Sequence, residues 1–148
     1  MHTKTYSIII DHDLESLDLS NLHELMFSLL NSPIGWGKYY MFIPVSHDAN
    51  ILIHISSPDT LHRITGRSDL SCAELNGNVI HFNVYRWLYG SPISQLNLHD
   101  YRQYMVTHEM GHIFGLKHVP IPKSGLAPIM IQQTLGIGNC IPNCELFL

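Results

Sequence analysis

The sequence is poor in charged residues and has no excess of basic ones. Asp, Glu, Lys and Arg make up 14% of its 148 residues, and the formal net charge is −4. A basic surface for nucleic acid or for anionic lipid is therefore not expected. Long apolar runs are also missing, since none approaches the roughly 18 residues that cross a bilayer. The composition thus argues against a nucleic-acid-binding protein and against a membrane span.

Cysteine is scarce, and an export signal is not visible. The three cysteines are Cys72, Cys140 and Cys144. They form no Cys-x-x-Cys pair of the kind that holds a second metal, so free thiols or one loop disulfide both remain open. The apolar run Ile8–Ile10 is too short for a signal-peptide core and is followed at once by acidic residues. Localisation therefore stays open.

Apolar residues, at 45%, supply enough material for a packed interior. The length is that of one domain, and no repeat or linker divides it, so we expect a single domain over residues 1–148 and a monomer. Short β-rich segments and two amphipathic segments predict an α+β fold, with a small mixed sheet, a backing helix and an active-site helix. The Pro- and Gly-rich last thirty residues are expected to be irregular.

The expected strands are 5–10, 39–45 and 51–55, followed by a hairpin. Asn76-Gly77 between strands 71–75 and 78–84 predicts a two-residue type I′ turn, which needs positive φ at both positions. Helices are expected at about 22–29, capped by Ser20 and ended by Pro33 and Gly35, and at 58–64. The main helix is expected from about Leu98 to Phe114, with Asn97 as its N-cap.

The segment from His108 to His118 carries the chemistry. Residues four apart lie on the same side of a helix, so His108 and His112 can offer their imidazoles to one ion. Glu109 lies beside the first ligand, where it can hold a metal-bound water without binding the ion itself. Gly115 can end the helix in the left-handed conformation and reverse the chain. His118 then follows within reach as a third ligand.

Three neutral nitrogen ligands leave one position of a zinc ion open, as in catalytic rather than structural sites. Zn²⁺ is the expected cofactor, although nickel, cobalt or iron would also accept these ligands. Chance agreement at five fixed positions, on a helix expected independently, falls well below about one in a thousand. The pattern therefore favours a metal site over histidines that are simply hydrogen-bonded in a core.

On these residues the sequence resembles the metzincin clan of zinc peptidases, whose signature is His-Glu-x-x-His-x-x-Gly-x-x-His followed by a methionine-bearing turn. Met130, in Ala127-Pro128-Ile129-Met130, matches that turn. The resemblance implies a compact zincin-like fold in which Met130 lies beneath the metal. Taken alone, a methionine in an apolar run is more often ordinary core, and it is the match to the signature that favours the turn.

A closer likeness, from about residue 35 to Cys140, is to a bacterial family of uncharacterised zincin-like domains that are usually exported or membrane-anchored. The matching pieces are Tyr101-Arg102-Gln103-Tyr104 before the motif, and Gln132-Gln133-Thr134 and Cys140 after Met130. The sequence departs from that family in two respects. It has no export signal, and no cysteine lies in Pro120–Pro122, just after the third histidine.

The predicted function is that of a zinc-dependent endopeptidase acting on peptide or protein substrates. Glu109 would act as the general base, and zinc itself would stabilise the oxyanion. Tyr101, Tyr104 and Gln132 are candidates for a second oxyanion donor, although a packing role is favoured for each. By resemblance, the substrate would pair with the sheet edge at Ser71, Cys72, Ala73, Glu74 and Leu75. The alternatives are a non-catalytic zinc-binding module and a hydrolase of a non-peptide amide.

Overall fold

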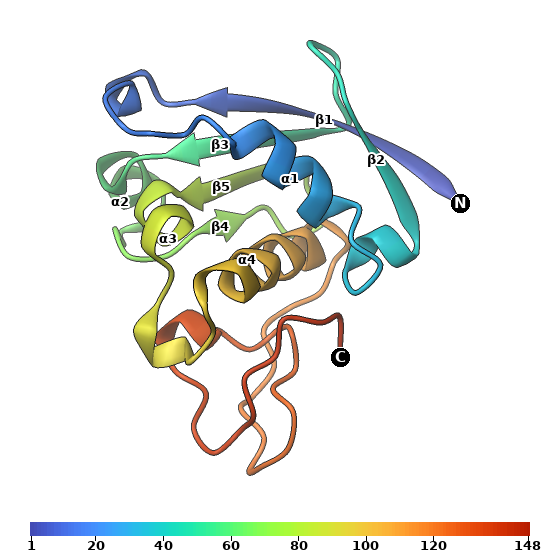
Figure 1. Cartoon of the computed structure of the whole chain (residues 1–148), viewed down its shortest axis with the longest axis vertical. Helices are drawn as coiled ribbons and strands as arrows, with labels where there is room; N and C mark the ends of the chain where they lie inside the picture. Colours follow the sequence, from blue (N-terminus) through green and yellow to red (C-terminus); the bar gives the residue numbers. More distant parts are fainter.

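The computed structural model describes all residues 1–148. A long first strand and a helix are followed by two pairs of strands with a helix after each pair, then by the main helix and an irregular C-terminal segment (Figure 1). The strands are β1 (His2–Ile10), β2 (Tyr40–Pro44), β3 (Ile51–Ser56), β4 (Cys72–Ala73) and β5 (Val79–Asn83). The helices are α1 (Leu22–Leu30), α2 (Pro58–Thr65), α3 (Val84–Tyr89) and α4 (Leu98–Ile113), and the short 3₁₀ turns are η1 (His12–Leu14), η2 (Trp36–Lys38), η3 (Pro92–Ser94) and η4 (Gln133–Leu135).

The five strands form one mixed sheet in the order β2-β1-β3-β5-β4. The pairs β1–β2, β1–β3 and β3–β5 are parallel, and only β4 runs antiparallel, against β5. Alternation along the strands gives the sheet one buried face, which contains Tyr6, Ile53 and Phe82. The expected α+β class and the small mixed sheet are confirmed.

Helices α1 and α4 lie next to each other and pack on the sheet (Figure 1). Their buried side chains join those of the strands in one apolar cluster, with Met26 from α1 and Met110 from α4 among its members. The side chain of Asn31, just after α1, bonds both the N–H and the C=O of Phe42 and so fixes the helix against β2. A smaller cluster of Ala127, Ile131, Ile137 and Cys140 holds the C-terminal segment together.

Two expected local features differ in the structure. Ser20 does not cap α1: the residue before the helix is Asn21, the Leu22 N–H donates to the Leu19 carbonyl, and the Ser20 N–H is bound by Asp18. A backbone turn thus supplies what the serine hydroxyl was expected to supply. Helix α3, where residues up to 84 were expected to be strand, begins because Asn83 accepts hydrogen bonds from the N–H groups of Tyr85 and Arg86.

The hairpin between β4 and β5 exists, but its turn is not type I′. Asn76 has a φ of +54° and Gly77 does not have a positive φ, and the Gly77 N–H donates to the Glu74 carbonyl. The Asn76 N–H is bound at 2.9 Å by the carbonyl of His112, at the end of α4. A tertiary contact therefore sets the loop geometry. The edge strand is also shorter than expected, with only Cys72 and Ala73 paired.

All three cysteines are free thiols, so none of the open disulfide pairings forms. Cys140 is buried, and its thiol donates to the Pro122 carbonyl. No helix combines the length and the apolar character that a membrane crossing needs.

Candidate metal site

Helix α4 is the element that positions the first two histidines. It begins at Leu98, where the Asn97 side chain accepts from the Asp100 N–H, so the expected N-cap is confirmed. His108 and His112 lie one turn apart and are both buried. Glu109, between them, is 6% exposed. The helix is buried along nearly its whole second half, so these polar side chains face a cavity and not bulk solvent.

Gly115 reverses the chain after α4. Its φ is +92°, its N–H donates to the His112 carbonyl, and the Leu116 N–H donates to the Gly111 carbonyl. These two bonds form a Schellman motif, which satisfies carbonyls left open at the helix end. A Cβ at this position would lie 2.4 Å from the side-chain oxygen of Asn76, so any other residue would have to displace that side chain as well as adopt the unfavourable φ.

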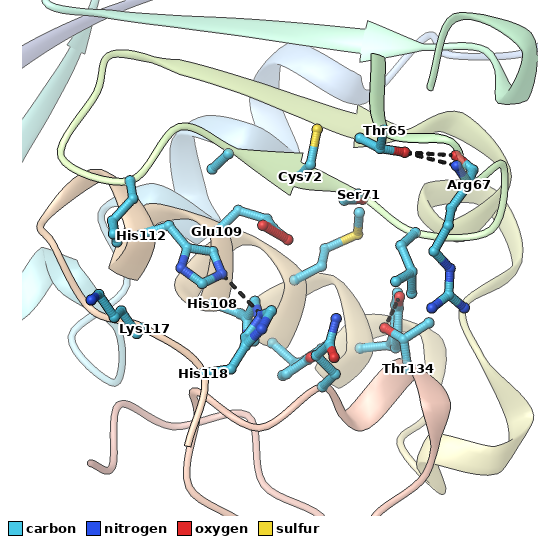
Figure 2. Close-up of a pocket in the computed structure, with 17 residues that line it drawn as sticks. Thr65, Arg67, Ser71, Cys72, His108, Glu109, His112, Lys117, His118 and Thr134 are labelled. Atoms are coloured by element: carbon cyan, nitrogen blue, oxygen red, sulfur yellow. Dashed lines mark hydrogen bonds between the residues drawn. The ribbon is translucent and has the colours of Figure 1, made fainter. Parts of the chain in front are cut away.

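The reversal brings His118 back to the helix. Its Nε2 atom lies 3.2 Å from Nε2 of His108 and 3.1 Å from Nε2 of His112. Figure 2 shows the imidazoles pointing toward one another, with the Glu109 carboxyl beside them. One ligand atom from each histidine lies within 4.8 Å of the other two, so the three could hold one metal ion.

Backbone carbonyls orient two of the rings. Nδ1 of His108 lies 2.7 Å from the Ile129 carbonyl, and Nδ1 of His112 lies 2.7 Å from the Leu116 carbonyl. A carbonyl only accepts, so Nδ1 carries the proton and Nε2 presents a lone pair. Lone pairs at little more than 3 Å from each other repel unless a cation or proton lies between them. The donor set thus fits a metal ion that binds neutral imidazole.

Burial also sets the charge state of these groups. Desolvation lowers the pKa of His108 to about 3, and it lowers the pKa of His112 and of His118 as well. The histidines are therefore neutral, as metal ligands must be. Desolvation raises the pKa of Glu109 to about 8 in the metal-free protein, where no hydrogen bond from the protein reaches its carboxyl. A cation beside it would favour the ionised carboxylate.

Met130 packs against α4 at Gly111. Its side chain is 2% exposed, and a Cβ built on Gly111 would lie 2.6 Å from its sulfur. The glycine in the middle of α4 therefore lets this methionine approach the helix backbone between the two histidines. The Met130 carbonyl accepts from the Val119 N–H, next to the third histidine, and the neighbouring Ile129 carbonyl holds the His108 ring, so this segment is tied to the first and third ligands.

A cavity of about 390 Å³ opens over the histidines and Glu109. One wall comes from the β4 region, where Ser71, Cys72, Ala73 and Leu75 line it, whereas Glu74 does not. The other wall comes from Gln132 and Thr134 of the C-terminal segment. Lys117 and Arg67, which sequence reasoning missed, lie at its two ends (Figure 2). No sequence signal marks either cation, because both belong to loops.

The three residues considered as oxyanion donors differ in what their side chains bind. The Tyr101 hydroxyl is paired with Thr134 at 2.7 Å. The Tyr104 hydroxyl donates to the Ile131 carbonyl and accepts from the Gln133 N–H. Both tyrosines thus fix the C-terminal segment to α4. Gln132 lines the cavity with no hydrogen bond from its side chain to the protein, which leaves its amide free for a ligand.

Comparison with known proteins places the chain in a family. No curated protein matches it. Two solved structures of myroilysin are similar at a TM-score of 0.49 and 15% identity, covering 78% and 86% of this chain and 48% and 46% of theirs. The chain thus spans about half the length of these proteins. The family model described as "Protein of unknown function (DUF3152)" matches residues 2–143, and the chain belongs to that family.

Proposed function

We propose that the protein is a zinc-dependent endopeptidase in which His108, His112 and His118 hold the metal and Glu109 acts as general base. The observation that carries this proposal is the convergence of three Nε2 atoms beside a buried carboxyl that has no hydrogen bond from the protein. A structural site would have no use for such a carboxyl, and all four residues line an open cavity.

Zinc held by three imidazoles would supply a Lewis acid that polarises a carbonyl and lowers the pKa of water to about 7. Glu109 would accept the proton of the attacking water and pass it to the leaving amine, which requires an ionised carboxylate at the start. Burial alone would keep the Glu109 carboxyl protonated near neutral pH, so the charge of the bound cation is what would hold it in the ionised form that can take the proton. Gln132 would orient the scissile carbonyl through its free amide.

The substrate would bind in the cavity along the free edge of β4. This strand ends the sheet, so its outer edge has no neighbouring strand. Ser71, Cys72, Ala73 and Leu75 contribute the wall, and an extended peptide there would pair with backbone groups. Glu74, the remaining residue of the stretch expected at this edge, belongs to the hairpin loop.

The finer structural assignments belong to the same proposal. The chain would form one zincin-like domain over residues 1–148 of the metzincin type and act as a monomer. Its Met-turn would be the segment around Met130. The buried methionine against Gly111 and the helix end at Gly115 both support this assignment.

The test compares the wild type with Glu109→Gln and, as a matched control, Glu74→Gln on the hairpin loop. Each protein is analysed for bound metal and incubated with a peptide library whose cleavage products are identified by mass spectrometry. We expect one zinc per chain in all three, with cleavage abolished only in Glu109→Gln. Metal retained with no peptide cleaved by the wild type would contradict the proposal. It would favour a non-catalytic zinc module or a hydrolase of non-peptide amides.

A further inference from the structure

A second surface depression adjoins the metal site on the side of the C-terminal segment. This groove, which we call the 118–138 groove, has a volume of about 360 Å³. His118 and Gln132 line both it and the metal-site cavity, so the two spaces adjoin at these side chains. An occupant that extends past the metal on this side enters the groove.

The groove presents apolar side chains to solvent. Val119 is 41% exposed, Ile121 is 52% exposed and Leu135 is 41% exposed, and all three line it. No Asp, Glu, Lys or Arg is among the lining residues. Exposed apolar side chains that gather in one concave place mark a binding surface more often than single ones do. The chemistry of the groove therefore suits an uncharged apolar group.

Two glycines leave the backbone that lines the groove uncovered by side chains. Gly136, with a φ of +120°, has no atom within 4 Å of the position a Cβ would take. Gly138, with a φ of +58°, leaves only an ordinary contact with Ile121. The glycines thus keep the floor free of side chains, and the apolar walls remain accessible.

We infer that the 118–138 groove is a specificity subsite, which takes an apolar side chain of the peptide within two or three residues of the cleaved bond. This inference rests on the proposed peptidase function. His118 itself lines the groove, and one extended residue spans about 3.3 to 3.6 Å, so a peptide held at the metal site needs only a few residues to reach it. Ile121 and Leu135 determine the preference, because their side chains form the exposed apolar walls.

The experiment uses a peptide library randomised at the positions around a fixed centre. Cleavage by the wild type gives the selection at each position. Binding of the same library to zinc-loaded Glu109→Gln protein gives a second selection that does not depend on turnover. We expect one position to favour Leu, Ile, Met or Phe over Ser by about ten-fold. Ile121→Ser and Leu135→Ser should remove that preference, with zinc content unchanged.

Ile93→Ser is the control, since Ile93 is 59% exposed in η3 and lies outside the groove. It should keep the wild-type selection. If both groove variants cleave with an unchanged apolar preference, or if no position shows an apolar preference, the groove is not a specificity subsite. The cleavage itself would still support the peptidase function. If apolar peptides bind and this binding is lost in Ile121→Ser, but no peptide is ever cleaved, the peptidase function is refuted and the groove is supported as a binding site for apolar side chains. Neither binding nor cleavage would refute both.

Discussion

The contact between Gly111 and Met130 predicts that Gly111→Ala destabilises the wild-type protein but stabilises a variant that lacks the methionine side chain. Replacing glycine by alanine inside a helix normally stabilises a protein by about 1 kcal/mol. Here the added methyl carbon would lie 2.6 Å from the Met130 sulfur, about 1 Å closer than an ordinary contact. Met130 is 2% exposed and cannot move into solvent. Overpacking of this kind costs about 1–3 kcal/mol, so Gly111→Ala should lose up to about 2 kcal/mol overall.

Removing the methionine side chain should reverse that result. Met130→Ala leaves a cavity and should cost about 2–5 kcal/mol by itself. In that background Gly111→Ala meets no sulfur, partly fills the space and gains helix propensity, so it should stabilise by about 1 kcal/mol. The difference between the two effects is a coupling of about 1–3 kcal/mol, as expected for residues in contact.

The assay is urea unfolding of the wild type, both single variants and the double variant, followed by circular dichroism in the presence of EDTA. The chelator removes the contribution of bound metal, so that only packing is compared. A Gly111→Ala change that stabilises both backgrounds equally would show that Met130 does not lie against α4. The proposed Met-turn at Met130 would then lose its structural support.

Three further predictions concern the site and its helix. His118→Ala should weaken zinc binding by at least about 100-fold in a competition assay, because one of three ligands is lost; unchanged affinity would mean that the chain does not return at Gly115. Gly115→Ala should lower stability by about 1–2 kcal/mol or more in thermal unfolding, because the φ of Gly115 is +92° and the Asn76 side chain lies where the alanine Cβ would be. An unchanged stability would argue against a helix end at Gly115. In metal-free protein, burial raises the pKa of Glu109 to about 8 from an unfolded value of 4.5. Between pH 4.5 and 8 the folded state therefore retains a proton that the unfolded state has released. As pH rises through that window, the free energy of unfolding of the wild type should fall relative to that of Glu109→Gln, by up to about 1.4 kcal/mol per pH unit. A difference that does not change with pH would refute the burial of an isolated carboxyl.

Much of the site follows from spacing alone. Residues four apart on a helix must share a side, so the relation of His108 to His112 needed no tertiary information. The cap at Asn97 and the reversal at Gly115 are local chemistry as well, and both lie where the sequence predicts them. The mixed sheet followed from strand-like segments separated by helical ones.

What sequence reasoning missed depends on contacts between distant segments. The hairpin turn was assigned from Asn76-Gly77, but the bond from Asn76 to the end of α4 sets its shape. Gly111 fell at a position of the motif where any residue is allowed, and its role appears only when Met130 is placed against it. The carbonyl of Ile129 that orients His108 lies 21 residues away and carries no side-chain signal.

The carbonyl of Ile129 has a consequence for the C-terminal quarter of the chain. After α4 this region contains only the short turn η4, and few backbone ladders stabilise it. It is nevertheless joined to the imidazoles through Ile129 and through His118 itself. Any ligand that binds the native arrangement and not the unfolded one adds its binding free energy to the stability of that arrangement. A metal bound by the three histidines would thus stabilise this region, and its amide protons should exchange faster when a chelator is present.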